Sequence, residues 1–142
     1  MSTGGGFFDL DTPQQLFQKL QHDYQRILNA PGDRYAAMDF VLTATHLPNW
    51  TFNYVKDSFG PQEICRELAN GSKHFRRKYS AVRDTKVVGG AFQFSAFDPA
   101  VFDVGHLVVE VGESWTAEFG TEIGVDDLAK KVLDFWQRNF ST

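Results

Sequence analysis

Apolar side chains recur at helical spacing over the first half of the chain, and the earliest such segment predicts a helix over Pro13–Asn29. Thr12 is a suitable N-cap, and Pro13 suits the first helical position, where its missing N–H would have no partner. The apolar positions of this helix are Leu16, Phe17, Leu20, Tyr24, Ile27 and Leu28. Pro31-Gly32 then interrupts the pattern and predicts a turn.

A second helix is expected from Asp33, its N-cap, to Leu47. Its apolar face is formed by Ala37, Phe40, Val41, Ala44 and Leu47. Pro48 has no backbone donor and disfavours helical geometry in the residue before it, so we expect it to end or kink this helix. Residues 50–59 are rich in aromatic side chains, and their pattern fits either a strand or a helix.

Two more helices are predicted further along the chain. One opens at Gly60-Pro61 and is expected to run to about Tyr79. The other covers Val125–Phe140 and closes the sequence. Its buried stripe is predicted at Leu128, Val132, Phe135, Trp136 and Phe140.

Three segments of β-type composition lie between these two helices. They are Val87–Ser95, Val101–Val111 and Trp115–Glu122, and Gly112–Ser114 is predicted to be a hairpin turn. Grouped helices followed by grouped strands indicate the α+β class. We therefore expect one domain over residues 1–142, built from a three-helix N-terminal segment, an antiparallel β-meander of about three strands and a C-terminal helix. Residues 1–10 are expected to be a flexible tail.

Composition narrows the class of protein. A chain of 142 residues with 42% hydrophobic content can bury a core without disulfides, and its single cysteine, Cys65, is expected inside that core. A lone cysteine favours a reducing compartment, so a cytoplasmic location is expected. No apolar run approaches the roughly 20 residues of a membrane helix, so no membrane partner is expected. The four histidines lack zinc-site spacing, and we expect no metal and no cofactor.

The net charge of −4 conceals two opposed bands. Residues 66–86 contain seven basic residues against two acids, Glu67 and Asp84. Residues 87–129 contain eight acids and neither Lys nor Arg. Two interpretations remain open: the basic band meets an anionic partner, or the bands neutralise each other within the fold or across a dimer.

The predicted third helix carries a polar stripe within the basic band. At about 100° per residue, the stripe occupies an arc of about 100° opposite the apolar side chains. Its members are Arg66, Asn70, Lys73, His74 and Arg77. The second helix has a narrower stripe of Asp39, Thr43 and His46, which would meet the first if the helices pack antiparallel. Alternatively, Asp39 and Thr43 face water and His46 caps a helix end.

The run from Arg66 to Phe75 resembles the signature of HEPN (higher eukaryotes and prokaryotes nucleotide-binding) domains, in which an Arg and a polar residue precede a His. Asn70 and His74 match the polar residue and the His. The motif Arg would fall at Ala69, and Arg66 is the nearest substitute. The resemblance covers about ten residues and implies a helical bundle in bacterial or phage defence or toxin–antitoxin systems, often a metal-independent ribonuclease.

Metal-free RNA cleavage needs a base for the 2′-OH and a cation near the developing phosphorane charge. Histidine and arginine suit these tasks, so the resemblance implies catalytic roles for His74 and Arg66. Asn70, Lys73 and Arg77 would bind RNA or a nucleotide, and Asp39 and His46 would support them. The alternative hypothesis is a non-enzymatic, homo-oligomeric interaction module or a subunit of a larger assembly.

Overall fold

Three helices, a small antiparallel sheet and a closing helix follow one another along the chain. The computed structural model describes residues 8–51, 59–74, 82–88 and 105–141, with only the backbone given for 72–74 and 141. The elements in order are α1 (Pro13–Asn29), α2 (Arg34–Thr51), α3 (Gly60–His74), β1 (Val82–Val88), β2 (His106–Val111), α4 (Thr116–Phe119), β3 (Glu122–Gly124) and α5 (Val125–Ser141). The predicted α+β class is confirmed.

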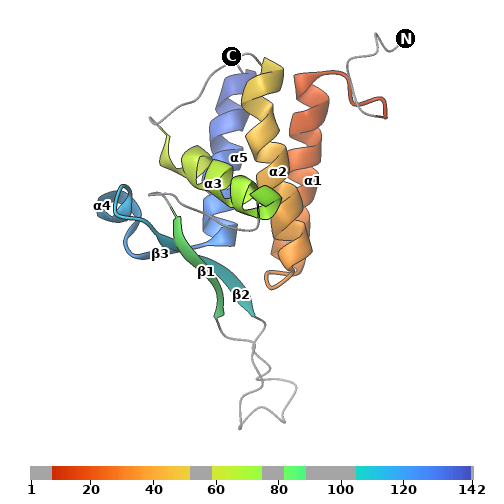
Figure 1. Ribbon diagram of the computed structural model, residues 1–142. Helices are drawn as coiled ribbons and strands as arrows, with labels where there is room; N and C mark the ends of the chain where they lie inside the picture. The colour runs from red at the N-terminus through yellow and green to blue at the C-terminus, as the bar shows by residue number, and fades with distance from the viewer. Residues whose placement is uncertain (1–7, 52–58, 75–81, 89–104, 142) are drawn as a thin grey trace, which may run out of the picture.

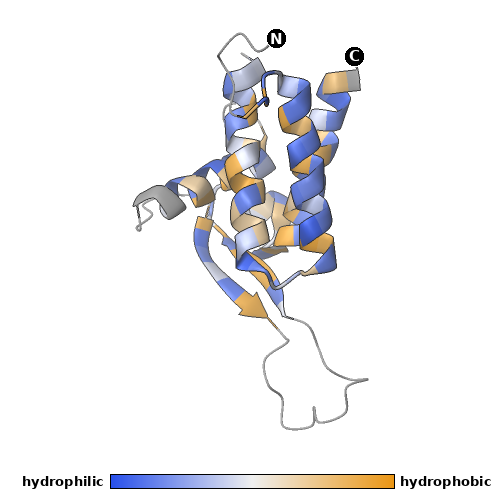
Figure 2. Ribbon diagram, turned by 90° about the vertical axis from the view of Figure 1, so that its right-hand side faces the viewer, coloured by the Kyte–Doolittle hydropathy of each residue, from blue (hydrophilic) through white to orange (hydrophobic). Residues whose placement is uncertain are grey.

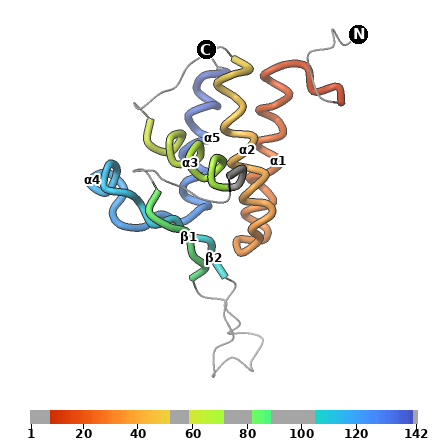
Figure 3. Tube along the Cα trace, viewed as in Figure 1, coloured from red at the N-terminus to blue at the C-terminus, as the bar shows by residue number. Residues whose placement is uncertain are grey.

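The helices form a layer over one face of the sheet (Figure 1). α1, α2 and α5 lie side by side, and α3 crosses them and packs on α2 and α5. The sheet has the order β1-β2-β3 with both pairs antiparallel, as the predicted meander requires. α5 contacts β2 and β3, and α3 contacts β1. The tube view shows the sheet at the end of the helical layer where α1 turns into α2 (Figure 3).

The first helix begins and ends where the apolar pattern predicts. The Thr12 hydroxyl accepts a hydrogen bond from the Gln15 backbone N–H at 3.1 Å, and the Gln15 side chain accepts from the Thr12 N–H at 3.0 Å. This reciprocal capping box fixes the start of α1. The prediction for Leu28 is wrong, because its side chain is 46% exposed. It lies about 100° around the helix from Ile27, outside the buried stripe.

The start of α2 is also confirmed, but its predicted end is not. Asp33 accepts a hydrogen bond from the Tyr35 N–H at 2.9 Å, as an N-cap does. The helix then continues through Pro48 to Thr51 instead of ending at Leu47. Proline at this position removes the donor that would normally serve the carbonyl of Ala44, four residues earlier.

The side chain of Gln62 replaces the missing donor. Its Nε2 donates to the Ala44 carbonyl at 2.7 Å, and its Oε1 accepts from Nε1 of Trp136 at 3.2 Å. Gln62 is 4% exposed and Trp136 is fully buried, so both bonds lie inside the protein. One amide from α3 therefore satisfies orphan groups on α2 and α5 together.

The strands differ in position from their predictions. β1 begins at Val82 instead of Val87, because pairing with β2 overrides the charged composition of residues 83–86. β2 lies within the predicted second segment, while residues 89–95 and 101–104 fall outside the described residues. The predicted strand Trp115–Glu122 is wrong: α4 occupies half of it, and β3 starts only at Glu122.

Trp115 and Phe119 explain the turn of helix at α4. Their four-residue spacing brings their ring centroids to 6.1 Å. A Cβ on Gly60 would lie 2.7 Å from the Phe119 ring and 2.9 Å from that of Trp115, so the glycine permits this close approach. The hairpin predicted at Gly112–Ser114 is therefore a turn into α4, and residues 112–121 connect β2 to β3.

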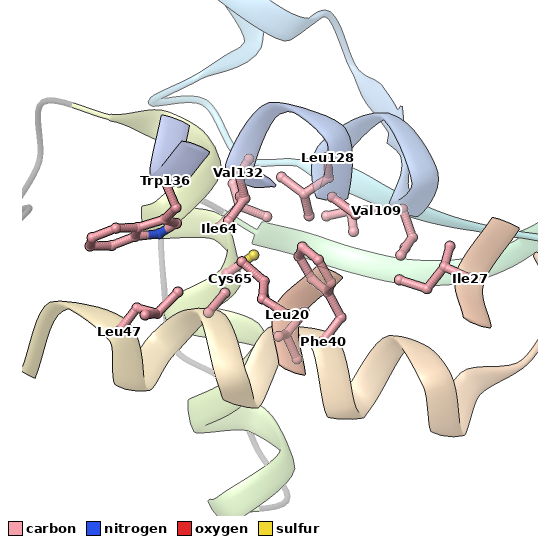
Figure 4. Packing of buried hydrophobic residues seen from close by; sticks show 14 of the residues in the cluster. Leu20, Ile27, Phe40, Leu47, Ile64, Cys65, Val109, Leu128, Val132 and Trp136 are labelled. Atoms are coloured by element: carbon pink, nitrogen blue, oxygen red, sulfur yellow. The ribbon is translucent and has the colours of Figure 1, made fainter. Parts of the chain in front are cut away.

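The core lies where the helices and the sheet meet. Figure 4 shows Trp136, Ile64 and Leu47 from three different helices packed together. Along the helices, hydrophobic and hydrophilic stretches alternate as amphipathic elements require (Figure 2).

α5 ends within one residue of its predicted boundary. Among the described residues, no helix combines the length and the apolar character needed to cross a bilayer.

The Gln62 bridge generates a test by mutation. We expect Gln62→Leu to lower the free energy of unfolding by about 3 kcal/mol, because it leaves a buried carbonyl and a buried indole N–H unpaired. Pro48→Ala restores the helical donor to Ala44, so the same Gln62→Leu change should cost about 1 kcal/mol less in that background. Urea denaturation of the four proteins measures this coupling.

The exposed residue Gln18 provides the control, since Gln18→Leu should change stability by less than about 0.5 kcal/mol. An equal cost of Gln62→Leu in both backgrounds would mean that the amide does not serve the proline-orphaned carbonyl.

Candidate nucleic-acid interface

α3 turns its apolar side inward and its polar side outward. Ile64 and Cys65 are fully buried, whereas the Arg66 side chain is 51% exposed and Asn70 is half-buried. The predicted division into two faces is therefore confirmed over residues 64–70. The buried side of α3 packs against the other helices. This packing, and not the polar contacts of the exposed side, determines which residues of α3 face outward.

Arg66 has a defined place on this outer face. Its Nε donates to Oε2 of Glu63 at 3.1 Å, and a second guanidinium nitrogen donates to the other carboxylate oxygen. The pair is bidentate and spans one turn of α3, with Glu63 mostly buried. A bidentate contact limits the rotamers of the long arginine side chain and keeps its guanidinium beside the helix.

Lys73 and His74 form the last turn of α3. They follow Arg66 by seven and eight residues, so helical periodicity places them on the same side at a rise of roughly 11–12 Å. Four of the five predicted stripe positions therefore share one side of the helix. The fifth, Arg77, lies outside the described residues.

The position of the missing motif arginine lies on the inner face. Ala69 is only 6% exposed and packs toward the interior. A long cationic side chain at this position would need to leave the core or be buried at high cost. Arg66 is the arginine in the described part of α3, and it lies about 60° around the helix from residue 69, at the edge where the buried face meets the exposed one.

Asp39 and His46 do not join this stripe. Asp39 accepts a hydrogen bond from Nη1 of Arg26 on α1 at 2.5 Å. Its predicted contact with the polar face of α3 is therefore replaced by a pair with α1. His46 is exposed in the interior of α2, so it does not cap a helix end.

A polar network between α1 and α2 explains why the polar stripe of α2 does not face α3. Asp23 is 1% exposed and accepts from Lys19 at 2.6 Å, and the Thr43 hydroxyl lies 3.1 Å from the same carboxylate oxygen. Lys19 also donates to Thr43 at 2.9 Å. The polar stripe of α2 thus finds its complement on α1, which has Lys19, Asp23 and Arg26 on the facing side.

Burial of Glu67 changes the charge balance of the basic band. Its side chain is among the least exposed polar groups, at 2%, and Oε1 accepts from the Val82 backbone N–H at 3.1 Å. The carboxylate joins α3 to the start of β1 inside the fold. It therefore does not lie among the basic side chains of the surface, although the sequence places it directly after Arg66.

At the other end of the band, Lys86 is neutralised. Its Nζ lies 3.5 Å from Glu110 and also pairs with Glu122, on the sheet face away from the helices. The hydrogen bond to Glu122 raises the pKa of Lys86 above its ordinary value. The expectation of mutual neutralisation within the fold thus holds for this lysine.

A polar hollow of about 650 Å³ beside this ion pair is lined by Arg83 and three glutamates, Glu110, Glu113 and Glu122. Excess carboxylates make it a poor site for a phosphate. The described residues contain no group of three or more side chains suited to holding a metal ion.

Comparison of the chain with family models, with curated proteins and with solved structures finds no match. The assignment of a function therefore depends on the residues themselves.

Cys65 gives a direct test of the inner face of α3. Complete burial raises the pKa of its thiol to about 12, from a reference value of 9.0. At pH 8 the thiol of the folded protein should therefore react with a disulfide reagent at least about 100-fold more slowly than a cysteine introduced by Ser114→Cys in the exposed turn. Time-resolved thiol labelling checks this.

The raised pKa of Cys65 also determines how the stability of the fold changes with pH. The unfolded thiol loses its proton near pH 9 and the folded one does not, so this group should destabilise the fold progressively as the pH rises from 9 towards 12. Equal labelling rates at the two cysteines would show that the inner face of α3 is open to solvent.

Proposed function

We propose that this protein binds RNA through phosphate contacts on the outer face of α3. The observation that carries the proposal is the burial of Glu67, which leaves Glu63, the bidentate partner of Arg66, as the acid paired with the stripe among the described residues of α3. The run of residues 73–78, which begins in the last turn of α3, contains four basic residues and no acid. A surface with this balance favours a polyanion.

Each residue type in the stripe suits a different part of the contact. Arg66 offers a fork of N–H donors that matches phosphate geometry, and Lys73 adds a point charge one turn beyond Asn70. The amide of Asn70 has both a donor and an acceptor, and no hydrogen bond involves it within the described part of the protein. We assign it the orientation of a nucleotide through base or ribose edges.

RNA cleavage is a stronger form of the same proposal, supported by the resemblance to HEPN domains. His74 would accept the proton of the 2′-OH, and Arg66 would stabilise charge on the phosphate. Along one helix these residues are separated by about 12 Å, too far for both to act on one phosphate without a second copy or a bent strand. The proposed chemistry therefore couples cleavage to pairing of two α3 helices.

Salt dependence provides the test of binding. If Arg66, Lys73 and Arg77 each contact a phosphate, log K for single-stranded RNA should fall with log salt at a slope of about −2. The double variant Arg66→Ala, Lys73→Ala should reduce this slope to about −0.7 and weaken binding roughly tenfold or more at low salt. Fluorescence anisotropy with a labelled oligonucleotide measures both quantities.

Lys130 and Lys131 provide a charge-matched control on α5, where Lys130 pairs with Asp134. Replacing both by Ala should leave the slope unchanged. An equal loss in the two double variants, or no salt-sensitive affinity in the wild type, contradicts binding at α3.

A separate experiment tests cleavage. A mixed RNA pool incubated with the wild type in a metal chelator should be cut, and His74→Ala should lower the rate by a factor of about 10²–10⁴. Negligible cleavage by both proteins rejects the ribonuclease while leaving the binding proposal to the salt titration.

A further inference from the structure

An open apolar groove lies between α2 and the sheet, on the opposite side of α2 from the α1 network. Its volume is about 390 Å³. Its apolar lining comes from α2, α3, both long strands and the start of α5, and includes Met38, Val41, Leu68, Val87 and Val125. The helix-facing side of β1 extends beyond the helices here and leaves the groove without a cover among the described residues.

The apolar surface continues past the rim of the groove. Of the lining residues, Met38 is 43% exposed and Val87 is 62% exposed, and Tyr35, which follows the lining residue Arg34 in the chain, is 68% exposed. Single exposed apolar residues are ordinary, but two in the lining of one apolar groove mark a candidate site of interaction.

The charges at the rim define the chemistry of the partner. Arg34 and Lys86 both belong to the lining, but the Lys86 ammonium is engaged by Glu110 and Glu122 on the other face of the sheet. Arg34 lies over the Tyr35 ring at 5.7 Å, and no carboxylate pairs with it in the described part of the chain. The groove therefore suits a partner with a bulky apolar group next to an acid.

The chain itself carries such a segment before α1. Phe8 is 87% exposed, the highest value among the large hydrophobic side chains of the described residues, and the exposed Asp9 follows it. Both residues have left-handed backbone geometry, with φ values of 49° and 67°. This geometry is unfavourable for non-glycine residues, and here it occurs at an aromatic residue whose side chain is exposed.

The segment cannot reach the groove of its own molecule. It precedes the first turn of α1, whereas Arg34 begins α2 just after the far end of α1. The 17 residues of α1 separate the two by about 25 Å, and Figures 1 and 3 show them at opposite ends of the helical layer.

We propose that Phe8 of one molecule inserts into the groove of a second copy, where Asp9 pairs with Arg34. Met38 supplies a polarisable sulfur to the groove for the inserted phenyl group. The two surfaces in contact are different, so the interface is head-to-tail and can propagate into rings or open chains. It shares no described residue with the outer face of α3, and self-association is measured without RNA.

Sedimentation velocity over a range of concentrations tests the proposal. The average mass of the wild type should increase with concentration, and Phe8→Ser or Arg34→Asp should each weaken association by about tenfold or more. Leu28→Ser removes another exposed hydrophobic residue, on α1, and should leave association unchanged.

Mixing provides the sharper experiment. Phe8→Ser retains an intact groove and Arg34→Asp retains an intact Phe8 segment, so an equimolar mixture should form dimers and stop there. Combining Asp9→Arg with Arg34→Asp in one chain should restore association through the exchanged charges. A wild type that stays monomeric at all concentrations, or association that survives Phe8→Ser, overturns the proposal.

Discussion

The buried amide of Gln62 is the contact on which the arrangement of the helices depends. Pro48 leaves the carbonyl of Ala44 without its helical donor, and an unpaired buried carbonyl costs about 1–3 kcal/mol. Gln62 serves that carbonyl and accepts from the Trp136 indole at the same time. α3 must therefore cross α2 and α5 at one position along its length. That position in turn determines which residues of α3 face outward and which face the core.

The sequence predicts those parts of the fold that depend on local chemistry. Thr12 and Asp33 cap their helices as expected, and the apolar spacing of α5 gives its bounds to within one residue. The end of α2 could not be predicted, because the donor that lets the helix continue past Pro48 lies 14 residues further along the chain. α4 was missed because Trp115 and Phe119 respond to the space above Gly60, which belongs to another element.

The candidate site shows the same division. Helical periodicity alone places Arg66 and Asn70 outside and Cys65 inside. It cannot indicate that Asp39 faces Arg26 or that Glu67 is buried, because both depend on which neighbour an element packs against. The helical wheel gives no signal for the burial of Glu67, because at about 100° from Arg66 it lies nearer the polar arc than the apolar one. The two charge bands are therefore neither fully separate nor fully neutralised.

The positions of the acidic residues bear on both interpretations of the charge pattern, an anionic partner for the basic band or its neutralisation by the acidic band. Lys86 is neutralised because antiparallel pairing brings Glu110 and Glu122 to its face of the sheet, whereas Glu67 is diverted inward by the start of β1. Neutralisation on the sheet thus involves Glu110 and Glu122, whereas on α3 Arg66 pairs with Glu63 and Glu67 lies inside the fold. The groove lies between these surfaces, and its exposed charge comes from Arg34, outside both bands. Polyanion binding and self-association would then use different cations, and a protein that assembles head-to-tail would repeat its α3 face along the assembly. Repetition of a weak phosphate-binding face raises avidity for a long polyanion without any new contact.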